Sequence, residues 1–248
     1  MIPKDRPEYK TVEGMPLWSM DVYYRFLNCG FRLPISAGSA SGVKAAPLGY
    51  NRVYVKPSKP FSYGTWFEAL KQGRSFATNG PMLFLKINRA EVGSTLSLGK
   101  RRPVRVNIES EAETLQPLDR MEILFKGRIV DTRRMPDSSG EWRANFTFNV
   151  SESGWFVARC FERPGSTIRF ARTSPVYVKF DDDAGVVAQD AQFFLDWIER
   201  EMGFYRAERG FRDKNHREEM IALFQKAQAV YERLVRESAA SSNRRLVQ

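Results

Sequence analysis

The feature that most restricts the fold is a series of short, partly alternating apolar runs between residues 82 and 180. Gly, Pro, Asp and Ser separate the runs at intervals typical of antiparallel sheets. In the clearest run, Phe146, Phe148 and Val150 would share one face of a strand. Gly127 follows Lys126 between two apolar runs and predicts a hairpin turn. This pattern predicts an immunoglobulin-like β-sandwich over residues 82–180, with strands near 82–88, 104–109, 121–126, 142–150, 155–162 and 175–180.

The preceding segment mixes helical and extended patterns. Residues 17–27 place apolar side chains at helical spacing, and Gly30 would end that helix. A short apolar strand is expected at the start of residues 31–43, followed by a loop of small residues. Residues 50–56 are rich in β-branched and aromatic side chains and predict another strand. A second helix is expected up to Gly73, with a cap at Ser62 or Thr65.

The C-terminal part is predicted to be a helical hairpin over residues 181–237. It follows a turn at Asp181, Asp182 and Asp183, which we interpret as solvated rather than as a cation site because the spaced ligands of a calcium loop are missing. A polar stretch at 206–215 would join the two helices, and residues 238–248 are expected to be a flexible tail. The apolar stripes that predict these helices are Phe193, Phe194, Trp197 and Ile198, then Met220, Leu223, Phe224, Ala227, Val230, Tyr231 and Leu234.

Composition excludes several kinds of metal site and bears on the class of partner. A single histidine and two cysteines cannot build a histidine-rich or four-cysteine zinc site. His216 is expected on a solvated helix surface, and Cys29 and Cys160 are expected to be free, buried thiols. The 39 Lys+Arg against 29 Asp+Glu give a net charge of +10, but the basic residues are scattered and their densest run is only 100–105. This dispersion argues against a nucleic-acid partner.

The chain is not expected to be a membrane protein. Its longest charge-free stretches, 33–43 and 75–85, are eleven residues each, whereas a transmembrane helix needs about 20. The N-terminus is polar and lacks the apolar core of a signal peptide. A cytoplasmic location is therefore the default expectation, and export is expected only if a preceding segment carries a signal.

The loop Gly-Ser-Ala-Ser-Gly at residues 38–42 belongs to a longer phrase. Residues 23–34 are Tyr-Tyr-Arg-Phe-Leu-Asn-Cys-Gly-Phe-Arg-Leu-Pro, and residues 47–55 are Pro-Leu-Gly-Tyr-Asn-Arg-Val-Tyr-Val. With Gly-Arg-Ser-Phe-Ala-Thr-Asn-Gly-Pro at 73–81, this phrase resembles the late part of carbaryl-hydrolase-type (CehA/McbA) metallohydrolases of the polymerase-and-histidinol-phosphatase (PHP) superfamily. The C-terminal helix around 226–234 is similar to the same family, so the resemblance covers most of the chain.

The resemblance implies an α+β protein: the end of a PHP-type α/β barrel in residues 1–81, then the β-sandwich and the helical hairpin. In the family, His and Asp residues hold divalent metals (Zn, Mn or Fe) that activate water. Many relatives carry a metal-binding Asp in the loop, where this chain has Ala40, and the family's His-x-His region has no counterpart here. No catalytic, metal or cofactor residue is therefore expected in this chain. The expected remainder of the pocket is Asn28, Arg32, Ser39, Ser41, Asn51 and Arg52.

Two functions follow as hypotheses. The first is a C-terminal, non-catalytic portion of a PHP-type metallohydrolase, which would need a barrel region from a further segment or from another protein chain. The second is a stand-alone β-sandwich module that contacts a glycan, a peptide or a protein. Trp142 and Trp155 would be candidate contacts if exposed, although we expect both first as core aromatics. The sequence leaves open whether Met1 is the true start of the protein.

Overall fold

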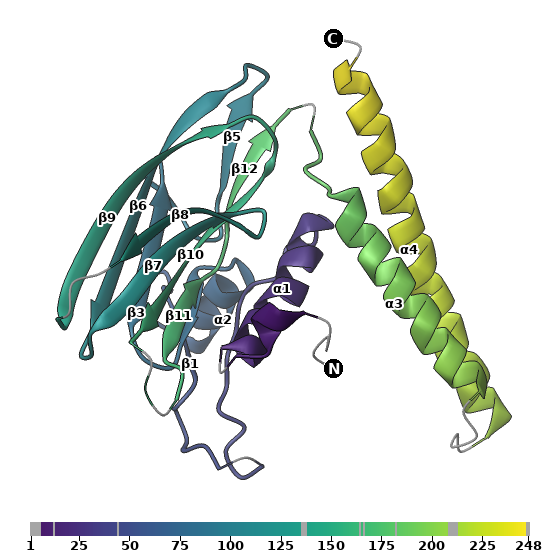
Figure 1. Cartoon of the computed structure of the whole chain (residues 1–248), viewed down its shortest axis with the longest axis horizontal. Coiled ribbons are helices and arrows are strands. Elements are labelled where there is room, and N and C mark those ends of the chain that lie inside the picture. Colours follow the sequence, from purple (N-terminus) through teal and green to yellow (C-terminus); the bar gives the residue numbers. More distant parts are fainter. Residues whose placement is uncertain are drawn as a thin grey trace. The chain divides into compact units, whose positions relative to one another are not determined.

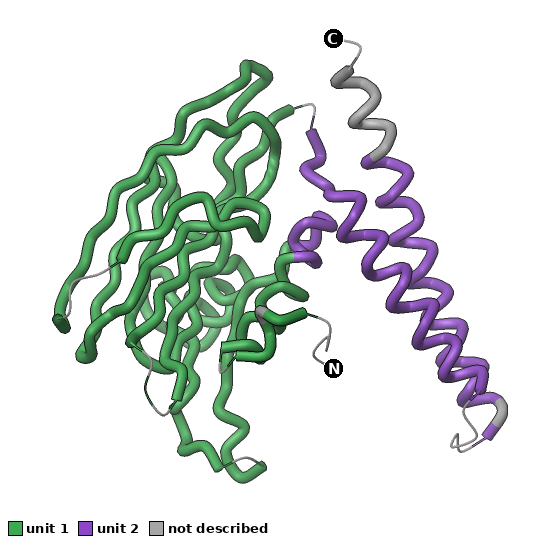
Figure 2. The backbone as a smooth tube through the Cα atoms, in the orientation of Figure 1, with its two compact units in different colours: residues 1–24, 32–182 green, residues 25–31, 183–248 purple. Residues whose placement is uncertain are grey.

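The computed structural model describes residues 6–11, 13–43, 45–134, 138–163, 165, 167–181, 183–207 and 213–246. These residues form an α+β protein with two sheets and four α-helices (Figure 1). The chain divides into two compact units, residues 1–24 with 32–182 and residues 25–31 with 183–248 (Figure 2). None of the described helices is long and apolar enough to cross a membrane.

Helix α1 (Gly14–Asn28) follows a short 3-10 turn, η1 (Pro7–Tyr9), and includes the predicted helix. Its side chains at Met20, Tyr24 and Leu27 are buried, and this spacing of four and three residues places them on one face. The chain leaves the helix through Gly30 at φ 86°, a left-handed conformation that glycine adopts without strain.

Helix α2 (Tyr63–Lys71) begins at the predicted cap. Ser62 Oγ accepts a hydrogen bond from the Thr65 N–H at 3.1 Å, and Thr65 Oγ1 accepts one from the Ser62 N–H at 2.9 Å. This reciprocal capping box satisfies two backbone donors that the first turn would otherwise leave free.

The prediction of a strand at the start of residues 31–43 is wrong, because residues 31–40 do not pair with another strand. Side chains take the place of a neighbouring strand. The Ile35 N–H donates to Ser174 Oγ at 3.4 Å, and Ser75 Oγ donates to the Ile35 carbonyl at 3.2 Å. Pro34 has no N–H to contribute to a ladder.

The larger sheet has the strand order β1-β2-β11-β10-β12-β5, and β7 pairs with both β10 and β8. Every pair is antiparallel except β12 with β5. It is an open sheet, and the described strands close no barrel. Strands from residues 52–78 and from residues 95–180 thus share one sheet. The strands are β1 (Arg52–Val55), β2 (Ser75–Thr78), β5 (Thr95–Gly99), β7 (Leu118–Phe125), β8 (Arg128–Arg134), β10 (Gly154–Glu162), β11 (Phe170–Thr173) and β12 (Val176–Phe180).

The smaller sheet is antiparallel with the order β4-β3-β6-β9. The predicted alternation is confirmed, since Phe146 and Val150 are buried and Phe148 packs against the same core. This core takes side chains from both sheets, so the two sheets pack face to face around it. The strands are β3 (Met82–Ile87), β4 (Ala90–Glu91), β6 (Val104–Thr114) and β9 (Gly140–Val150).

The predicted hairpin at Gly127 is also confirmed, because β7 and β8 pair across Lys126 and Gly127. Both turn residues have positive φ, 52° and 81°. Two successive residues with positive φ are the mark of the type I′ turn, whose twist matches that of the strands.

The second unit contains the predicted helical hairpin, α3 (Ala188–Ala207) and α4 (Lys214–Leu246). Part of the expected polar connection, residues 208–212, lies outside the described residues. The ring of Phe194 stacks on Phe26 at 4.3 Å and on Tyr231 at 5.0 Å between centroids. Residues 238–246, expected as a tail, continue α4.

Candidate functional site

The expected pocket residues around Ala40 form a hydrogen-bonded loop. Ser39 Oγ accepts from the Asn51 N–H at 2.9 Å and donates to the Asn51 carbonyl at 3.3 Å. Asn51 Nδ2 donates to the Gly38 carbonyl at 3.4 Å, and Arg52 Nη1 donates to the Gly49 carbonyl at 2.9 Å. These polar groups satisfy the backbone of the loop itself.

Of the other three expected pocket residues, two bond to residues outside this loop and the third is exposed. Arg32 Nη1 donates to Thr95 Oγ1 at 2.8 Å, and Ser41 is exposed. Asn28 belongs to the second unit, where its Nδ2 donates to Asp190 Oδ2 at 2.7 Å. The structure therefore brings Ser39, Asn51 and Arg52 together but does not assemble all six residues.

The loop does not fit a divalent metal. Ala40 presents only a methyl group, and the Ser39 hydroxyl is engaged with Asn51. Hydrolytic metal centres use several His, Asp, Glu or Cys ligands. Among the residues that the structure describes, no group of three or more such side chains is placed to hold a metal ion.

Asp190 organises polar residues of the second unit. Besides the Asn28 amide, it pairs with Arg25, whose guanidinium lies 4.3 Å from the centre of the Phe193 ring. Cys29 is buried nearby, and burial together with the Asp190 charge raises the pKa of its thiol to about 12. A thiol with this pKa stays protonated and is not a nucleophile at neutral pH.

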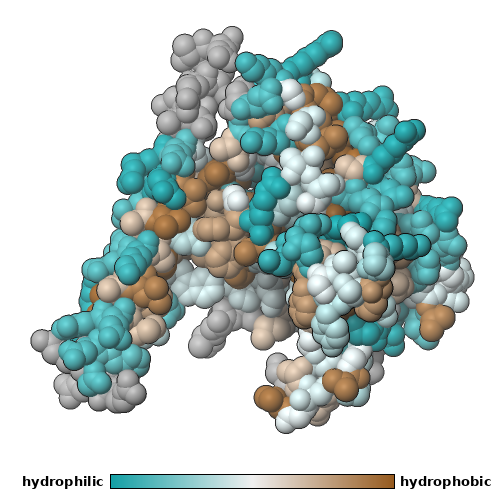
Figure 3. All heavy atoms as spheres, turned by 180° about the vertical axis from the view of Figure 1, so that it is seen from behind, coloured by the Kyte–Doolittle hydropathy of each residue, from teal (hydrophilic) through white to brown (hydrophobic). Residues whose placement is uncertain are grey.

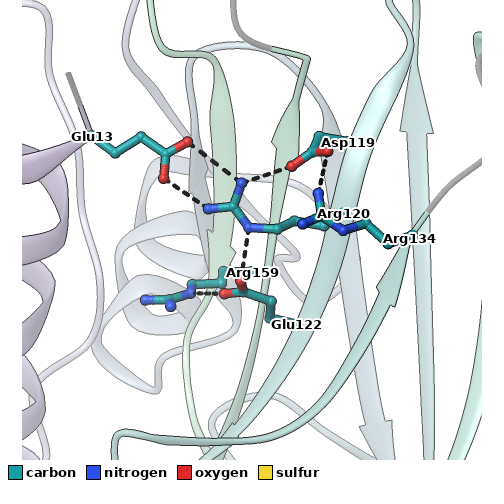
Figure 4. A network of polar contacts seen from close by, with 6 residues as sticks. All are labelled: Glu13, Asp119, Arg120, Glu122, Arg134 and Arg159. Atoms are coloured by element: carbon teal, nitrogen blue, oxygen red, sulfur yellow. Dashed lines mark hydrogen bonds and ion pairs between the residues drawn. The ribbon is translucent and has the colours of Figure 1, made fainter. Parts of the chain in front are cut away.

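A charge network on the larger sheet was not predicted from the sequence (Figure 4). Arg120 donates to Glu13 at 2.8 Å, to Asp119 at 2.8 Å and to Glu122 at 2.8 Å. Glu122 also pairs with Arg159, and both of these side chains are more than nine-tenths buried. Burial alone would lower the pKa of Arg120, but the hydrogen bonds that it donates to the three carboxylates outweigh this effect and raise its pKa. Every charged side chain in this network has a partner of opposite charge, so we interpret the network as stabilising the fold.

Arg172, next to this network, is a different case. The residue is only 4% exposed. Its guanidinium carbon lies 4.0 Å from the centre of the Tyr23 ring and 4.7 Å from that of the Tyr24 ring. Its Nε and Nη2 atoms have no hydrogen-bond partner. It forms no ion pair with the residues that the structure describes.

Two hollows lie on the first unit. One, of about 450 Å³, is lined by residues of β6, β8 and β9, including Asn107, Glu109, Asp131, Arg133 and Asn145. The other, of about 190 Å³, is lined by residues that include Arg32, Lys71 and Tyr177.

Both tryptophans pack against other residues, as the core interpretation expects, and neither is an exposed contact. Trp155 is only 2% exposed, and its ring lies 5.1 Å from that of Tyr24. Trp142 is half-buried and packs against the core. The two cysteines are free and buried as predicted. His216 lies in the first turn of α4, where its N–H donates to Asp213 Oδ1 at 2.8 Å.

Comparison with known proteins gives no relative, since no protein-family model matches the chain and no curated protein is significantly similar to it.

Proposed function

We propose that this chain is the C-terminal, non-catalytic portion of a PHP-superfamily metallohydrolase of the CehA/McbA type. In this proposal, residues 1–81 complete a barrel, and the two packed sheets of residues 82–180 are an immunoglobulin-like sandwich. The metal ligands come from a barrel region in a further segment or in another chain. The phrase at residues 23–55 supports this assignment, as does the ending at residues 73–81.

A concentration of exposed apolar side chains carries the proposal. We call residues 43–67 the docking segment. Five large apolar side chains of this segment are at least half exposed, and the rings of Tyr63 and Phe67 adjoin, with 6.1 Å between centroids. Exposed apolar side chains that lie together mark an interaction surface. The loop at the foot of Figure 1 and its apolar side chains in Figure 3 belong to this part of the chain. The residues are Val43, Leu48, Phe61, Tyr63 and Phe67.

Strand β1 adds a second reason for a partner at this segment. It pairs with β2 along one edge, and no described strand pairs with its other edge. An unpaired edge offers free N–H and C=O groups to an incoming strand. Barrel strands have neighbours on both sides, so a barrel region is an occupant that would satisfy this edge.

The first test is the coding sequence around this chain. We expect a His-x-His region with further His and Asp ligands, either in frame upstream of Met1 or in a neighbouring gene. Absence of such a region at both places would contradict the proposal.

The second test is co-purification of that barrel region with the chain. Leu48→Ser should weaken the association, because Leu48 is 92% exposed within the docking segment. Leu115→Ser is the matched control, since Leu115 is equally exposed outside this segment and should have no effect. An equal effect of both substitutions would show that the docking segment is not the contact surface for the barrel region. Stoichiometric, tightly bound metal in the chain alone would overturn its non-catalytic role.

The larger hollow favours the second candidate, a binding module. Paired positions of β6 and β9 place Asn107 beside Thr147 and Glu109 beside Asn145. Amide and carboxylate groups on neighbouring strands can hydrogen-bond to the hydroxyl groups of a short glycan. A glycan array with the whole chain tests this function, and Glu109→Gln with Asn145→Ala should abolish any signal. Binding that survives both substitutions would place the glycan elsewhere.

A further inference from the structure

The smaller hollow lies where the strand alongside β10 is interrupted. Strands β11 and β12 pair with successive parts of β10, and Ser174 and Pro175 separate them. Pro175 lines the hollow together with Gly73 and Gly93. The volume of about 190 Å³ is below the usual size of a drug-like ligand site.

Arg32, Lys71 and Tyr177 bring hydrogen-bond donors to this hollow. The remaining polar side chain of the lining is Gln72, whose Nε2 donates to Glu68 Oε1 at 3.0 Å. Arg32 is held by its bond to Thr95 and by the Tyr177 ring, whose centre lies 4.2 Å from the guanidinium carbon. Lys71 makes no ion pair with the described residues, and the Tyr177 hydroxyl makes no hydrogen bond with them. No carboxylate is among the lining residues. Burial raises the pKa of Tyr177 to about 12, so its hydroxyl keeps its proton at neutral pH.

The end of helix α2, which also borders the hollow, does not oppose an anion strongly. Carbonyl groups at a helix C-terminus carry partial negative charge. Here the Glu68, Leu70 and Ala69 carbonyls accept hydrogen bonds from the N–H groups of the three residues that follow the helix. These bonds satisfy three of the last four carbonyls of the helix and so reduce the negative charge at its end.

Arg172 adds positive charge near the hollow, since its charge acts on the lining residue Tyr177. The guanidinium of Arg172 lies against the Tyr23 ring. The Tyr23 hydroxyl donates to the carbonyl of Leu33, which lines the hollow. The Nε and Nη2 atoms of Arg172 lack hydrogen-bond acceptors, so the two tyrosine rings compensate its buried charge only in part. An anion in the nearby hollow would offset part of the remaining cost of burying this charge through the low-dielectric interior.

We propose that the hollow at Arg32, Lys71 and Tyr177 is a binding site for a small oxyanion, a phosphate or carboxylate group. Arg32 supplies a planar donor that suits such groups, and Lys71 supplies a mobile charge. The site requires no metal and is independent of the function proposed above.

Calorimetric titration of the full chain with inorganic phosphate, and separately with acetate, tests the site. Sodium chloride at equal ionic strength is the reference for non-specific screening. We expect saturable one-to-one binding, and the tighter of the two ligands identifies the class of oxyanion. The absence of saturation with either ligand up to about 10 mM would overturn the proposal.

Substitutions then locate the binding. Arg32→Gln and Lys71→Gln should each weaken it about tenfold or more, because each removes a charged hydrogen bond. Tyr177→Phe removes only the hydroxyl and should weaken binding less. Lys100→Gln is the matched control, since Lys100 is exposed and does not line the hollow. Equal losses in Lys71→Gln and Lys100→Gln would show diffuse charge attraction and refute the site. Lys71 is exposed, so its variant stays informative if Arg32→Gln fails to fold.

Discussion

Glu122 and Arg159 occupy paired positions of β7 and β10, and their side chains form a buried ion pair. The pair lies on the face of the sheet opposite the shared core, because its neighbours Ile123 and Ala158 belong to that core. Glu122 also accepts from Arg120, so a single carboxylate holds two guanidinium groups. Because Glu122 pairs with both guanidinium groups, we expect its substitution to destabilise the fold more than that of any other residue in the network.

Glu122→Gln should lower the free energy of unfolding by about 3–5 kcal/mol, because it leaves the Arg159 charge buried without its partner. Urea denaturation measures the change. Adding Arg159→Met should recover part of the loss, since the uncompensated charge is then removed. Arg143→Gln removes exposed ion pairs with Glu111 and Glu141 and should change little. If Glu122→Gln were as mild as this control, the buried pair would not stabilise the fold.

The network also predicts a dependence on acid pH. Burial alone would raise the pKa of Asp119, but the hydrogen bonds and charges of Arg120 and Arg134 outweigh it and hold the pKa below its usual value. The folded state therefore binds this proton less readily than the unfolded chain. The stabilisation is present above pH about 4 and is lost as the pH falls through the lower folded value. Asp119→Asn should flatten the decline of stability below pH 4, and an unchanged slope would contradict the assignment.

Local sequence signals predicted the elements that depend on them. The capping box at Ser62, the turn at Gly127 and the helix that ends at Gly30 each require a few neighbouring residues, and each was placed correctly. The alternation at Phe146 correctly indicated a half-buried strand. These features are encoded by residue type and spacing within one element.

Long-range pairings were not predictable in the same way. The pairing of β2 with β11 joins residues separated by almost a hundred positions, and no local pattern specifies it. No local pattern indicates that charged residues of β7 and β10 are buried, because charged side chains are seldom fully buried unless they are paired. Arg159 and Glu122 are buried together only because the register places them side by side. For the same reason, Arg32 and Tyr177 could not be brought together from the sequence.

The two thiols should be unreactive in the folded protein. Burial raises the pKa of Cys29 and that of Cys160 to about 12, with a smaller contribution from Asp190 at Cys29. An unfolded thiol ionises near pH 8.5, so stability should be constant below that pH and fall as the pH rises toward 12. Ellman's reagent at pH 8 should label neither cysteine in buffer and both in urea. Rapid labelling of the folded chain would show that one thiol is accessible.

A carboxylate at position 40, which the proposed function would use as a metal ligand, tests whether the loop holds a metal on its own. Ala40 is exposed and has φ 51°, a region that aspartate tolerates. Ala40→Asp should therefore fold with a change of no more than about 0.5 kcal/mol in the free energy of unfolding. A zinc centre needs about four ligands, and the nearest hydroxyl, Ser39, is bonded to Asn51. The variant should retain no zinc after dialysis, as measured by elemental analysis beside the unsubstituted chain. Stoichiometric zinc in Ala40→Asp alone would show that the loop supplies the remaining ligands without a barrel partner.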